Sequence, residues 1–245
     1  MNAKKMVERQ TGVALWRQIA DLIRLSISNG DYDQTGMIPP EIVLASQFGV
    51  NRHTVRSALA ALAEEGLVQA IQGRGTLIQR KERLSFPISR RTRFAEGLGD
   101  QARETEAKLL AQAALPAAVE VAAGLGIAPG TNCIMLDLMR SADGRPVSCS
   151  TNFFPAERFP HMAEQVERLG SITKAFAAEG LPDYVRVSTE LVARHADADE
   201  LALLRLSPGA IVIEATAINA DPDGVPVQFA RTRFAADRVK LKIET

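Results

Sequence analysis

The chain has 245 residues, of which 46% are hydrophobic, and its formal net charge is zero. This length allows either one large domain or two smaller ones. No apolar stretch approaches the ~18 residues that a membrane span needs. The N-terminal residues 1–5 are not followed by the apolar core of a signal sequence, so we expect a cytosolic protein.

Charge is distributed unevenly along the chain. Residues 1–94 contain 14 Lys and Arg against 8 Asp and Glu, a net charge of +6, whereas residues 95–245 contain 15 against 21, a net charge of −6. This difference is typical of a front part that meets a polyanion, although a solvated surface can carry the same charge. The two cysteines and three histidines have no metal-ligand spacing, so we expect neither a metal site nor a cofactor.

Three segments of the front part have the spacing of helices. Apolar residues recur every three or four positions over Leu15–Ile27, and Gly30 follows as a stop signal. A second helix is indicated after the two prolines at 39–40, and Gly49 ends it. The third segment, residues 51–66, starts with an asparagine that can cap a helix and closes with a glycine.

The third segment has two different faces. At about 100° per residue, its apolar residues share one face: Val55, Ala58, Leu59 and Leu62. Arg52, His53 and Arg56 cluster on another face near its start. A short helix, a tight turn and a helix with exposed arginines at its beginning are typical of a helix-turn-helix that reads the major groove. A surface helix with solvated arginines is the simpler alternative.

A basic hairpin follows the third segment. Apolar residues lie on both sides of Gln72-Gly73-Arg74-Gly75. The two glycines permit a tight turn with Arg74 at its tip, and a narrow minor groove attracts an inserted arginine. The three helices and this hairpin together predict a winged helix-turn-helix.

The stretch at 13–78, which includes IPPEIVLASQFGVNRHTVRSALAALAEEGLVQAIQGRGTLI, resembles the DNA-binding domain of the GntR family of bacterial transcription regulators. The resemblance implies base and phosphate contacts by the third helix and a minor-groove wing at Gly73 and Arg74. By position, the implied DNA-binding residues are Glu41, Arg52, His53, Thr54, Arg56, Gly73 and Arg74. Many members have an arginine or another polar residue after the glutamate, where this chain has Ile42, so a phosphate contact is not expected there.

The rear part contains an internal repeat. DGRPVSCSTNFFPAERF at 143–159 and DGVPVQFARTRFAADRV at 223–239 align at a constant offset of 80 residues. Each copy follows an Ala/Leu-rich helical stretch, a Pro-Gly turn and an apolar strand, and further helices are indicated at 161–179 and a strand at 184–195. Two such halves predict an antiparallel sheet with helices packed on it, so the fold class is α+β.

The charged segment 79–85, QRKERLS, separates the two parts and is interpreted as a linker. The expected organisation is therefore a winged helix-turn-helix domain at 1–78, the linker at 79–85 and a ligand-sensing domain at 86–245. The rear motif LMRSADGRPVSCSTNFFPAERF, with the closing DGVPVQFARTRFAADRV, resembles the UTRA-type effector-binding domain of the HutC subfamily of GntR regulators, which shares its fold with chorismate lyase.

Within that subfamily, VNRHTVR together with FPISRRTRFAEGL is most similar to PhnF-like regulators, which control genes for phosphonate uptake and breakdown. The resemblance implies effector contacts by Arg91, Arg93, Arg140, Ser150 and Gln228. Sugar-phosphate and histidine-pathway relatives often have glutamates at the last two positions. Neutral residues there suit an anionic effector such as a phosphonate, although they suit other ligands as well.

The string RTRF occurs at 91–94 and again at 231–234. The first copy lies where PhnF-like regulators begin the effector domain, so its arginines are candidates for anion contacts. On the second copy, side chains alternate along a strand, so Arg231 and Arg233 share a face that Gln228 does not. If Gln228 faces the ligand, these two arginines belong to the surface or to a dimer interface.

The sequence therefore predicts a homodimeric repressor that binds double-stranded operator DNA and is released by a small anionic effector, a phosphonate or a phosphate-containing metabolite. A regulator that senses a sugar phosphate, an amino acid or a fatty acid is an alternative. An enzyme like chorismate lyase is another, but the chain offers no nucleophile–base pair, and we expect no catalytic residue and no membrane partner.

Overall fold

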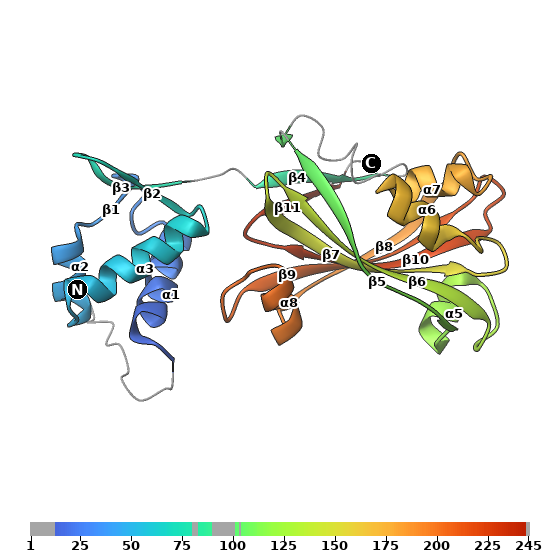
Figure 1. Ribbon diagram of the computed structural model, residues 1–245, viewed down its shortest axis with the longest axis horizontal. Coiled ribbons are helices and arrows are strands. Elements are labelled where there is room, and N and C mark those ends of the chain that lie inside the picture. The colour runs from blue at the N-terminus through green and yellow to red at the C-terminus, as the bar shows by residue number, and fades with distance from the viewer. Residues whose placement is uncertain (1–12, 80–82, 90–100, 103, 244–245) are drawn as a thin grey trace. The chain divides into compact units, whose positions relative to one another are not determined.

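Two units make up the chain, one at 1–82 and the other at 83–245. The computed structural model describes residues 13–79, 83–89, 101–102 and 104–243 (Figure 1). In this described part, no helix is long and apolar enough to cross a membrane.

The front unit contains the three predicted helices: α1 (Leu15–Ser28), α2 (Glu41–Phe48) and α3 (Arg52–Glu64). Gly49 ends α2 in the left-handed conformation at φ 66°, which a residue without a Cβ adopts at little cost. The side chain of Asn51 caps α3, as the sequence indicates. The tight turn between α2 and α3 is therefore built from two local signals in nearby residues.

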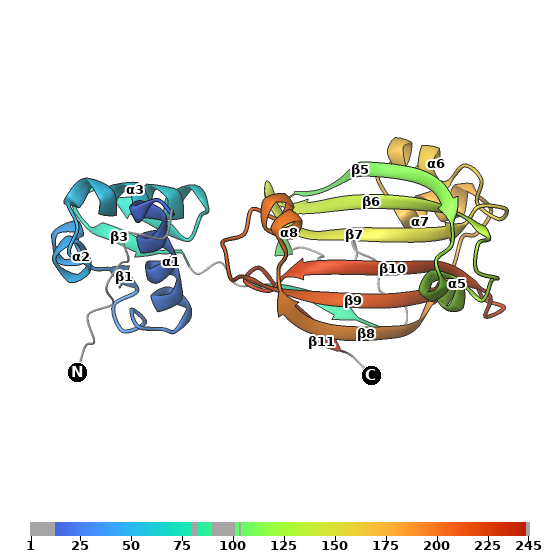
Figure 2. The same ribbon diagram turned by 90° about the horizontal axis from the view of Figure 1, so that it is seen from below.

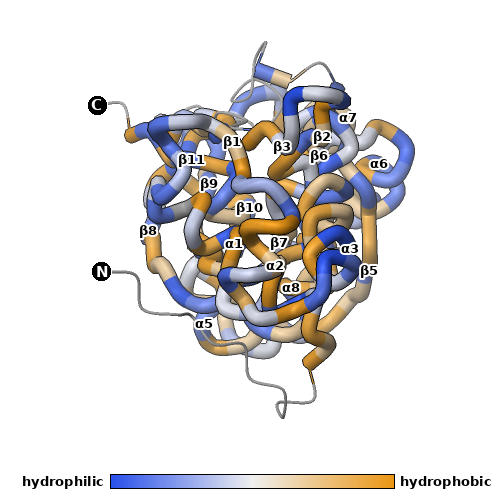
Figure 3. The backbone as a smooth tube through the Cα atoms, turned by 90° about the vertical axis from the view of Figure 1, so that its left-hand side faces the viewer, coloured by the Kyte–Doolittle hydropathy of each residue, from blue (hydrophilic) through white to orange (hydrophobic). Residues whose placement is uncertain are grey.

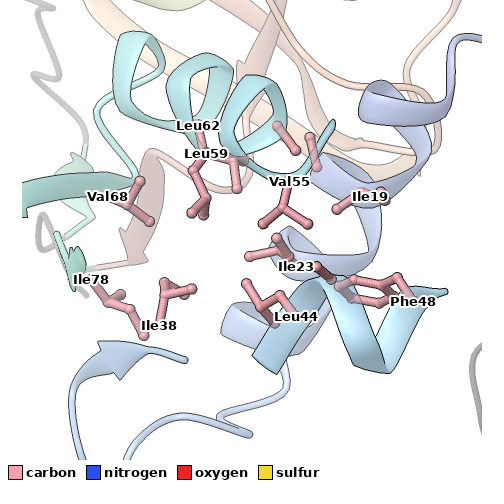
Figure 4. Close-up of a cluster of buried hydrophobic side chains, with 13 residues drawn as sticks. Ile19, Ile23, Ile38, Leu44, Phe48, Val55, Leu59, Leu62, Val68 and Ile78 are labelled. Atoms are coloured by element: carbon pink, nitrogen blue, oxygen red, sulfur yellow. The ribbon is translucent and has the colours of Figure 1, made fainter. Parts of the chain in front are cut away.

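A small antiparallel sheet completes the front unit. Strands β1 (Met37–Ile38), β2 (Val68–Ile71) and β3 (Gly75–Ile78) pair in the order β1-β3-β2. Their inward side chains join those of the helices in one hydrophobic core, in which α3 lies across α1 and α2 (Figure 4). Val55, Ala58 and Leu62 have no exposed surface, which confirms the predicted apolar face of α3.

The rear unit is built on a six-stranded antiparallel sheet in the order β5-β6-β7-β10-β9-β8 (Figure 2). Its strands are β5 (Thr105–Pro116), β6 (Asn132–Ala142), β7 (Arg145–Pro155), β8 (Val185–His195), β9 (Ile211–Ala220) and β10 (Pro226–Ala235). The repeat is visible in this order, because β5-β6-β7 and β8-β9-β10 are equivalent halves that meet at β7 and β10. Thr151 pairs with Arg231, its own equivalent 80 residues later, so an internal two-fold axis passes through this pair.

Other elements cover the two faces of the sheet unequally (Figure 1). Helices α6 (Met162–Leu169) and α7 (Ile172–Ala178), with the parallel pair β4 (Leu84–Ile88) and β11 (Val239–Ile243), lie on one side. The short helices α5 (Val119–Leu125) and α8 (Ala198–Leu203) lie on the other side, at opposite ends of the strands. The largest core of the unit, around Phe154, Phe159 and Phe176, joins α6 and α7 to the sheet.

Two details differ from the sequence-based expectation. The Ala/Leu-rich stretch before the first Pro-Gly turn is helical only in α5, and the twelve residues of β5 before it form an edge strand. The last two residues of the expected linker, Leu84 and Ser85, belong to β4 and pair with β11. Both differences arise because these segments pair with strands that are distant in the sequence. Hydropathy varies over short runs along the chain (Figure 3), so it does not reveal such pairing.

Candidate nucleic-acid interface and ligand cavity

The start of α3 is exposed and held by its cap. The Asn51 Oδ1 atom accepts hydrogen bonds from the Thr54 backbone N–H and from the Thr54 hydroxyl, both at 2.8 Å. This cap leaves Arg52, His53 and Arg56 exposed on the first turns of the helix. The positive end of the helix dipole adds to their charge, so the region attracts phosphate.

A glutamate orients the arginines of this surface. Glu41, the first residue of α2, accepts hydrogen bonds from Arg56 Nε at 3.0 Å and from Arg56 Nη2 at 2.8 Å. The Arg52 Nη2 atom lies 3.8 Å from the same carboxylate. The hydrogen bonds from Arg56 lower the pKa of Glu41, so it stays charged at neutral pH. Glu41 therefore holds both guanidinium groups at the junction of α2 and α3, and a bidentate pair restricts where Arg56 can point.

The wing lies beside this junction. Gly73 and Gly75 have φ angles of 75° and 102°, which favour glycine, and Arg74 between them is exposed at the tip of the β2–β3 hairpin. An open groove of about 940 Å³ has residues of the wing on one side and Glu41, Ile42 and Arg52 on the other. The structure thus brings all seven predicted DNA-contacting residues to the α2–α3 junction and the wing of one unit. Ile42 is 61% exposed here and offers no charge to a phosphate.

The rear unit contains a separate cavity of about 370 Å³ between the sheet and its covering layer of β4 and α7. Arg140 on β6, Ser150 on β7 and Gln228 on β10 all line it. Three of the five predicted effector residues therefore come together, from three different strands. Arg91 and Arg93 lie outside the described residues.

Two guanidinium groups, those of Arg140 and Arg186, give this cavity positive charge. Burial lowers the pKa of Arg140 to about 10, and burial also lowers the pKa of Arg186 on β8. Both groups remain protonated at neutral pH. The Arg186 Nε atom is buried and has no hydrogen-bond partner among the described residues. A buried donor without an acceptor costs free energy, so an anion in the cavity would be stabilised by it.

Ser150 and Gln228 belong to a chain of buried amides. Asn219 Nδ2 donates to Gln228 Oε1 at 2.6 Å, Gln228 Nε2 donates to Asn152 Oδ1 at 2.9 Å, and Asn152 Nδ2 donates to the Ser150 hydroxyl at 3.0 Å. Both polar atoms of Gln228 are thus engaged within the protein. Gln228 therefore connects Asn219 to Asn152, and the Asn219 Oδ1 atom at one end of this chain is buried and has no hydrogen-bond partner among the described residues.

The second RTRF copy faces away from this cavity. Gln228, Ala230 and Thr232 line the cavity, whereas Arg231 and Arg233 line a hollow on the opposite side of the sheet. Arg231 Nη2 donates to both carboxylate oxygens of Glu120, at 2.7 and 2.8 Å, and Arg233 Nη1 donates to the Thr151 hydroxyl at 3.1 Å. The predicted alternation along this strand therefore holds, with both arginines on the face that Gln228 does not share.

Sequence reasoning missed Arg186, Lys174 and the amides of Asn152 and Asn219, which also line the cavity. A signal for Arg186 exists, because a charged residue alternating with valines in YVRVSTELV is unusual on a half-buried strand. Asn152 and Asn219 lie within strands of the repeat, but their spacing in the sequence does not show whether they line a cavity or pack in a core. With Arg140, Arg186 and Lys174 against Glu106, the charged side chains lining the cavity are mainly basic.

A winged helix-turn-helix with an exposed basic reader helix defines a DNA-binding protein, and a second unit with a polar cavity defines a sensing domain attached to it. Comparison with known families agrees with this description. Residues 15–78 match the gntR family of bacterial regulatory proteins, and residues 100–240 match the UTRA domain. The chain belongs to the GntR family of transcriptional regulators and carries a UTRA effector-binding domain.

Individual relatives support the same assignment over nearly the whole chain. The chain is 68% identical to the uncharacterized HTH-type transcriptional regulator RB1450 of Rhizobium meliloti (strain 1021), over 98% of this chain and 99% of that protein. It is 29% identical to MngR, the mannosyl-D-glycerate transport/metabolism system repressor of Escherichia coli (strain K12), over 94% of this chain and 95% of that protein.

Among solved structures, that of PhnF from Mycobacterium smegmatis superposes with a TM-score of 0.63 at 26% identity, covering 93% of this chain and 98% of that one. These relatives are regulators of transcription, and both matched domains are typical of such regulators and not of enzymes. The alternative of a chorismate-lyase-like enzyme is therefore wrong.

Proposed function

We propose that this protein is a homodimeric repressor of the HutC type that leaves its operator when a small organic anion, a phosphonate in the first instance, enters the cavity of the rear unit. The observation that carries the proposal is the pair of half-buried arginines, Arg140 and Arg186, that line a cavity of about 370 Å³. Such a regulator acts on DNA in the cytoplasm.

The cavity suits a small ligand with charge at one end. Arg140 on β6 and Arg186 on β8 line the same cavity and attract an anion that enters it, and charge-assisted hydrogen bonds to such an anion are about twice as strong as neutral ones. The Ser150 hydroxyl and the Asn219 carbonyl oxygen supply a donor and an acceptor for the rest of the ligand. Arg91 and Arg93 remain proposed anion contacts on the strength of the family resemblance.

Release of DNA requires that the ligand prefer one conformation of the dimer. An effector that binds better to the state with misplaced reader helices weakens operator binding by the same factor by which DNA weakens effector binding. A coupling of about 1–3 kcal/mol corresponds to roughly 5- to 150-fold release. Helix-turn-helix dimers read two half-sites about 34–36 Å apart, so both readers must engage together for tight binding.

Fluorescence anisotropy on the DNA upstream of its own gene tests this function. The purified protein is titrated at fixed ionic strength, with and without methylphosphonate, because phosphate contacts make affinity steeply dependent on salt. We expect tight binding that methylphosphonate weakens and an equal ionic strength of chloride does not. Arg52→Ala and Arg56→Ala each remove a charge at the reader surface and should abolish specific binding, whereas Arg17→Ala, an exposed arginine on α1, serves as the matched control.

Operator binding that survives both reader substitutions would contradict the assignment of α3.

A second candidate ligand, a sugar acid, is favoured by the similarity to MngR and by the buried amide chain, whose ends can bind hydroxyl groups. Mannosylglycerate added in place of methylphosphonate distinguishes the two, because only one of them should release the DNA.

A further inference from the structure

The two arginines of the ligand cavity lie on strands that are far apart in the sheet. Arg140 is on β6 and Arg186 is on β8, with β7, β10 and β9 between them (Figure 2). Four strand spacings place their backbones roughly 19 Å apart, measured along the sheet. They also lie at different levels along the strands, because Arg140 is level with Phe234 and Arg186 with Gln228, six residues earlier on β10. We therefore expect each arginine to meet a different end of a bound ligand.

Small side chains line the space between these two arginines. On the intervening strands, the residues that line the cavity include Ser148, Ser150, Ala215, Ala217, Ala230 and Thr232. The cavity volume of about 370 Å³ lies in the range of about 300–1,000 Å³ that is typical of pockets for drug-sized ligands. A one-carbon phosphonate does not fill such a space. The cavity suits a longer molecule whose chain crosses these small residues.

At the β8 end of the cavity, a donor and an acceptor lie on neighbouring residues without partners. Arg186 on β8 and Asn219 on β9 are directly opposed in the sheet, so their side chains share a face, with Cβ atoms about 4.5–5.5 Å apart. The Arg186 Nε and Asn219 Oδ1 atoms are both buried, and neither has a hydrogen-bond partner among the described residues. Buried polar atoms without partners cost free energy, and a ligand that supplies both partners removes this cost.

These two atoms indicate the chemistry of the ligand group that fits between them. The Arg186 Nε–H group needs an acceptor, and a carboxylate matches a guanidinium in both charge and planar shape. The Asn219 Oδ1 atom needs a donor, such as a hydroxyl or an ammonium group. Because the two protein atoms come from paired residues, the acceptor and the donor of the ligand should be close together. A carboxylate with a hydroxyl or amino group on the adjacent carbon has this arrangement.

The buried amide chain holds Asn219 in the orientation that this contact requires. Asn219 Nδ2 donates to Gln228 Oε1 at 2.6 Å, and Gln228 Nε2 donates to Asn152 Oδ1 at 2.9 Å. Asn219 is also only 5% exposed. With its amino group engaged inside the protein, Asn219 can offer a ligand an acceptor through its Oδ1 atom.

We propose that Arg186 and Asn219 form a second recognition subsite in the ligand cavity, and that the effector is an elongated molecule with an anionic group at the Arg140 end and a 2-hydroxy- or 2-amino-carboxylate at this end. The inference rests on the proposed function, because it takes this cavity as the effector site. Arg186 binds the carboxylate, and Asn219 accepts a hydrogen bond from the neighbouring hydroxyl or amino group. The two residues thus select among the anions that enter the cavity.

Isothermal titration calorimetry of the full chain with four related phosphonates tests this subsite. Propylphosphonate has the anionic end alone, and 4-phosphonobutanoate adds the carboxylate. The compounds 2-hydroxy-4-phosphonobutanoate and 2-amino-4-phosphonobutanoate also add the donor. We expect the carboxylate to lower the dissociation constant by about tenfold or more, and the donor to lower it by a further factor of about five. The tighter of the last two compounds identifies the donor as a hydroxyl or an ammonium group.

Substitutions assign each gain to one residue. Arg186→Met should abolish the gain from the carboxylate, and Asn219→Leu should abolish the gain from the donor. Both variants should bind propylphosphonate as the wild type does, because this compound reaches neither residue, and this binding also reports that they fold. Arg168→Met, at an exposed arginine of α6 that does not line the cavity, is the matched control and should keep all four affinities.

Equal affinities of the wild type for all four compounds would overturn the subsite. An Arg186→Met protein with wild-type circular dichroism that loses propylphosphonate as well would also overturn it, because Arg186 would then bind the phosphonate itself. If Arg186→Met does not fold, Arg186→Lys takes its place. Lysine keeps the charge but lacks the planar donor, so it should lose most of the gain from the carboxylate.

Release of operator DNA separates this test from that of the proposed function. If the four compounds bind in the expected order and none releases the DNA, the proposed function is wrong and the subsite stands. If no phosphonate binds, the phosphonate effector of the proposed function is wrong, and the subsite is judged on glutarate and 2-hydroxyglutarate. These two differ only in the donor beside one carboxylate, so equal affinities for them, or no binding of either, would overturn the subsite.

Discussion

At the scale of single residues, function and stability oppose each other in the ligand cavity. Arg140 and Arg186 are half-buried charged groups, and burial lowers the pKa of both. For a base, a folded-state pKa below the unfolded value means that the charged form is less stable in the folded protein. Below pH 10 the folded state therefore bears a cost that an apolar side chain would not have.

This cost predicts a trade-off at Arg140. Arg140→Met should raise the free energy of unfolding of the ligand-free protein by about 1–2 kcal/mol, because well-packed apolar residues often replace buried charges with a gain in stability. The same change should remove the rise in unfolding temperature that methylphosphonate gives the wild type. Thermal unfolding with and without the ligand measures both effects. An Arg140→Met protein that is still stabilised by methylphosphonate would exclude Arg140 as an anion contact.

At the scale of elements, close packing decides where the short helices of the rear unit sit. Helix α5 approaches β10 at Gly124, where an added Cβ would lie 2.5 Å from the Cδ2 atom of Phe229. No real Cβ tolerates this distance, so the helix and strand can approach this closely only because position 124 has no side chain.

Gly124→Ala should therefore destabilise the protein by about 1–2 kcal/mol, although alanine by itself favours a helix by about 1 kcal/mol over glycine. Chemical denaturation measures this difference. In a Phe229→Leu background the clash is relieved, and the same substitution should become neutral or stabilising. If Gly124→Ala stabilises the wild type as well, the approach of α5 to β10 is wider than the structure has it.

At the scale of the whole molecule, the two units have separate cores. Each hydrophobic cluster of the described residues belongs to one unit only. Trp16 on α1 is the single tryptophan of the chain, so its fluorescence reports unfolding of the front unit alone. The strands of the rear unit dominate the circular dichroism of β-structure.

Ligand binding should consequently move one transition and not the other. At a methylphosphonate concentration of about 100 times its dissociation constant, the rear unit gains about 2.7 kcal/mol, and its transition by circular dichroism should shift upward. The transition followed by Trp16 should stay within the error of the measurement. An equal shift of both signals would mean that the units unfold as one cooperative body.

Features that depend on neighbours along the chain could be predicted from the amino-acid sequence. The apolar spacing of α3, its Asn51 cap and the glycines of the wing are local patterns, and each acquires its structure from the conformational preferences of a few adjacent residues. The 80-residue repeat is visible in the sequence because each half forms the same series of elements. These patterns were enough to indicate the fold class and the reader surface.

Features that depend on partners distant in the sequence became visible in the folded structure. The stretch that forms β5 is Ala/Leu-rich, and it is extended because β6 supplies its hydrogen bonds. Apolar residues occur on both faces of β10, so hydropathy could not settle that Arg231 and Arg233 point away from the cavity. The position of Arg186 in the cavity could not be predicted either, because the elements packed against a strand determine which of its faces points inward.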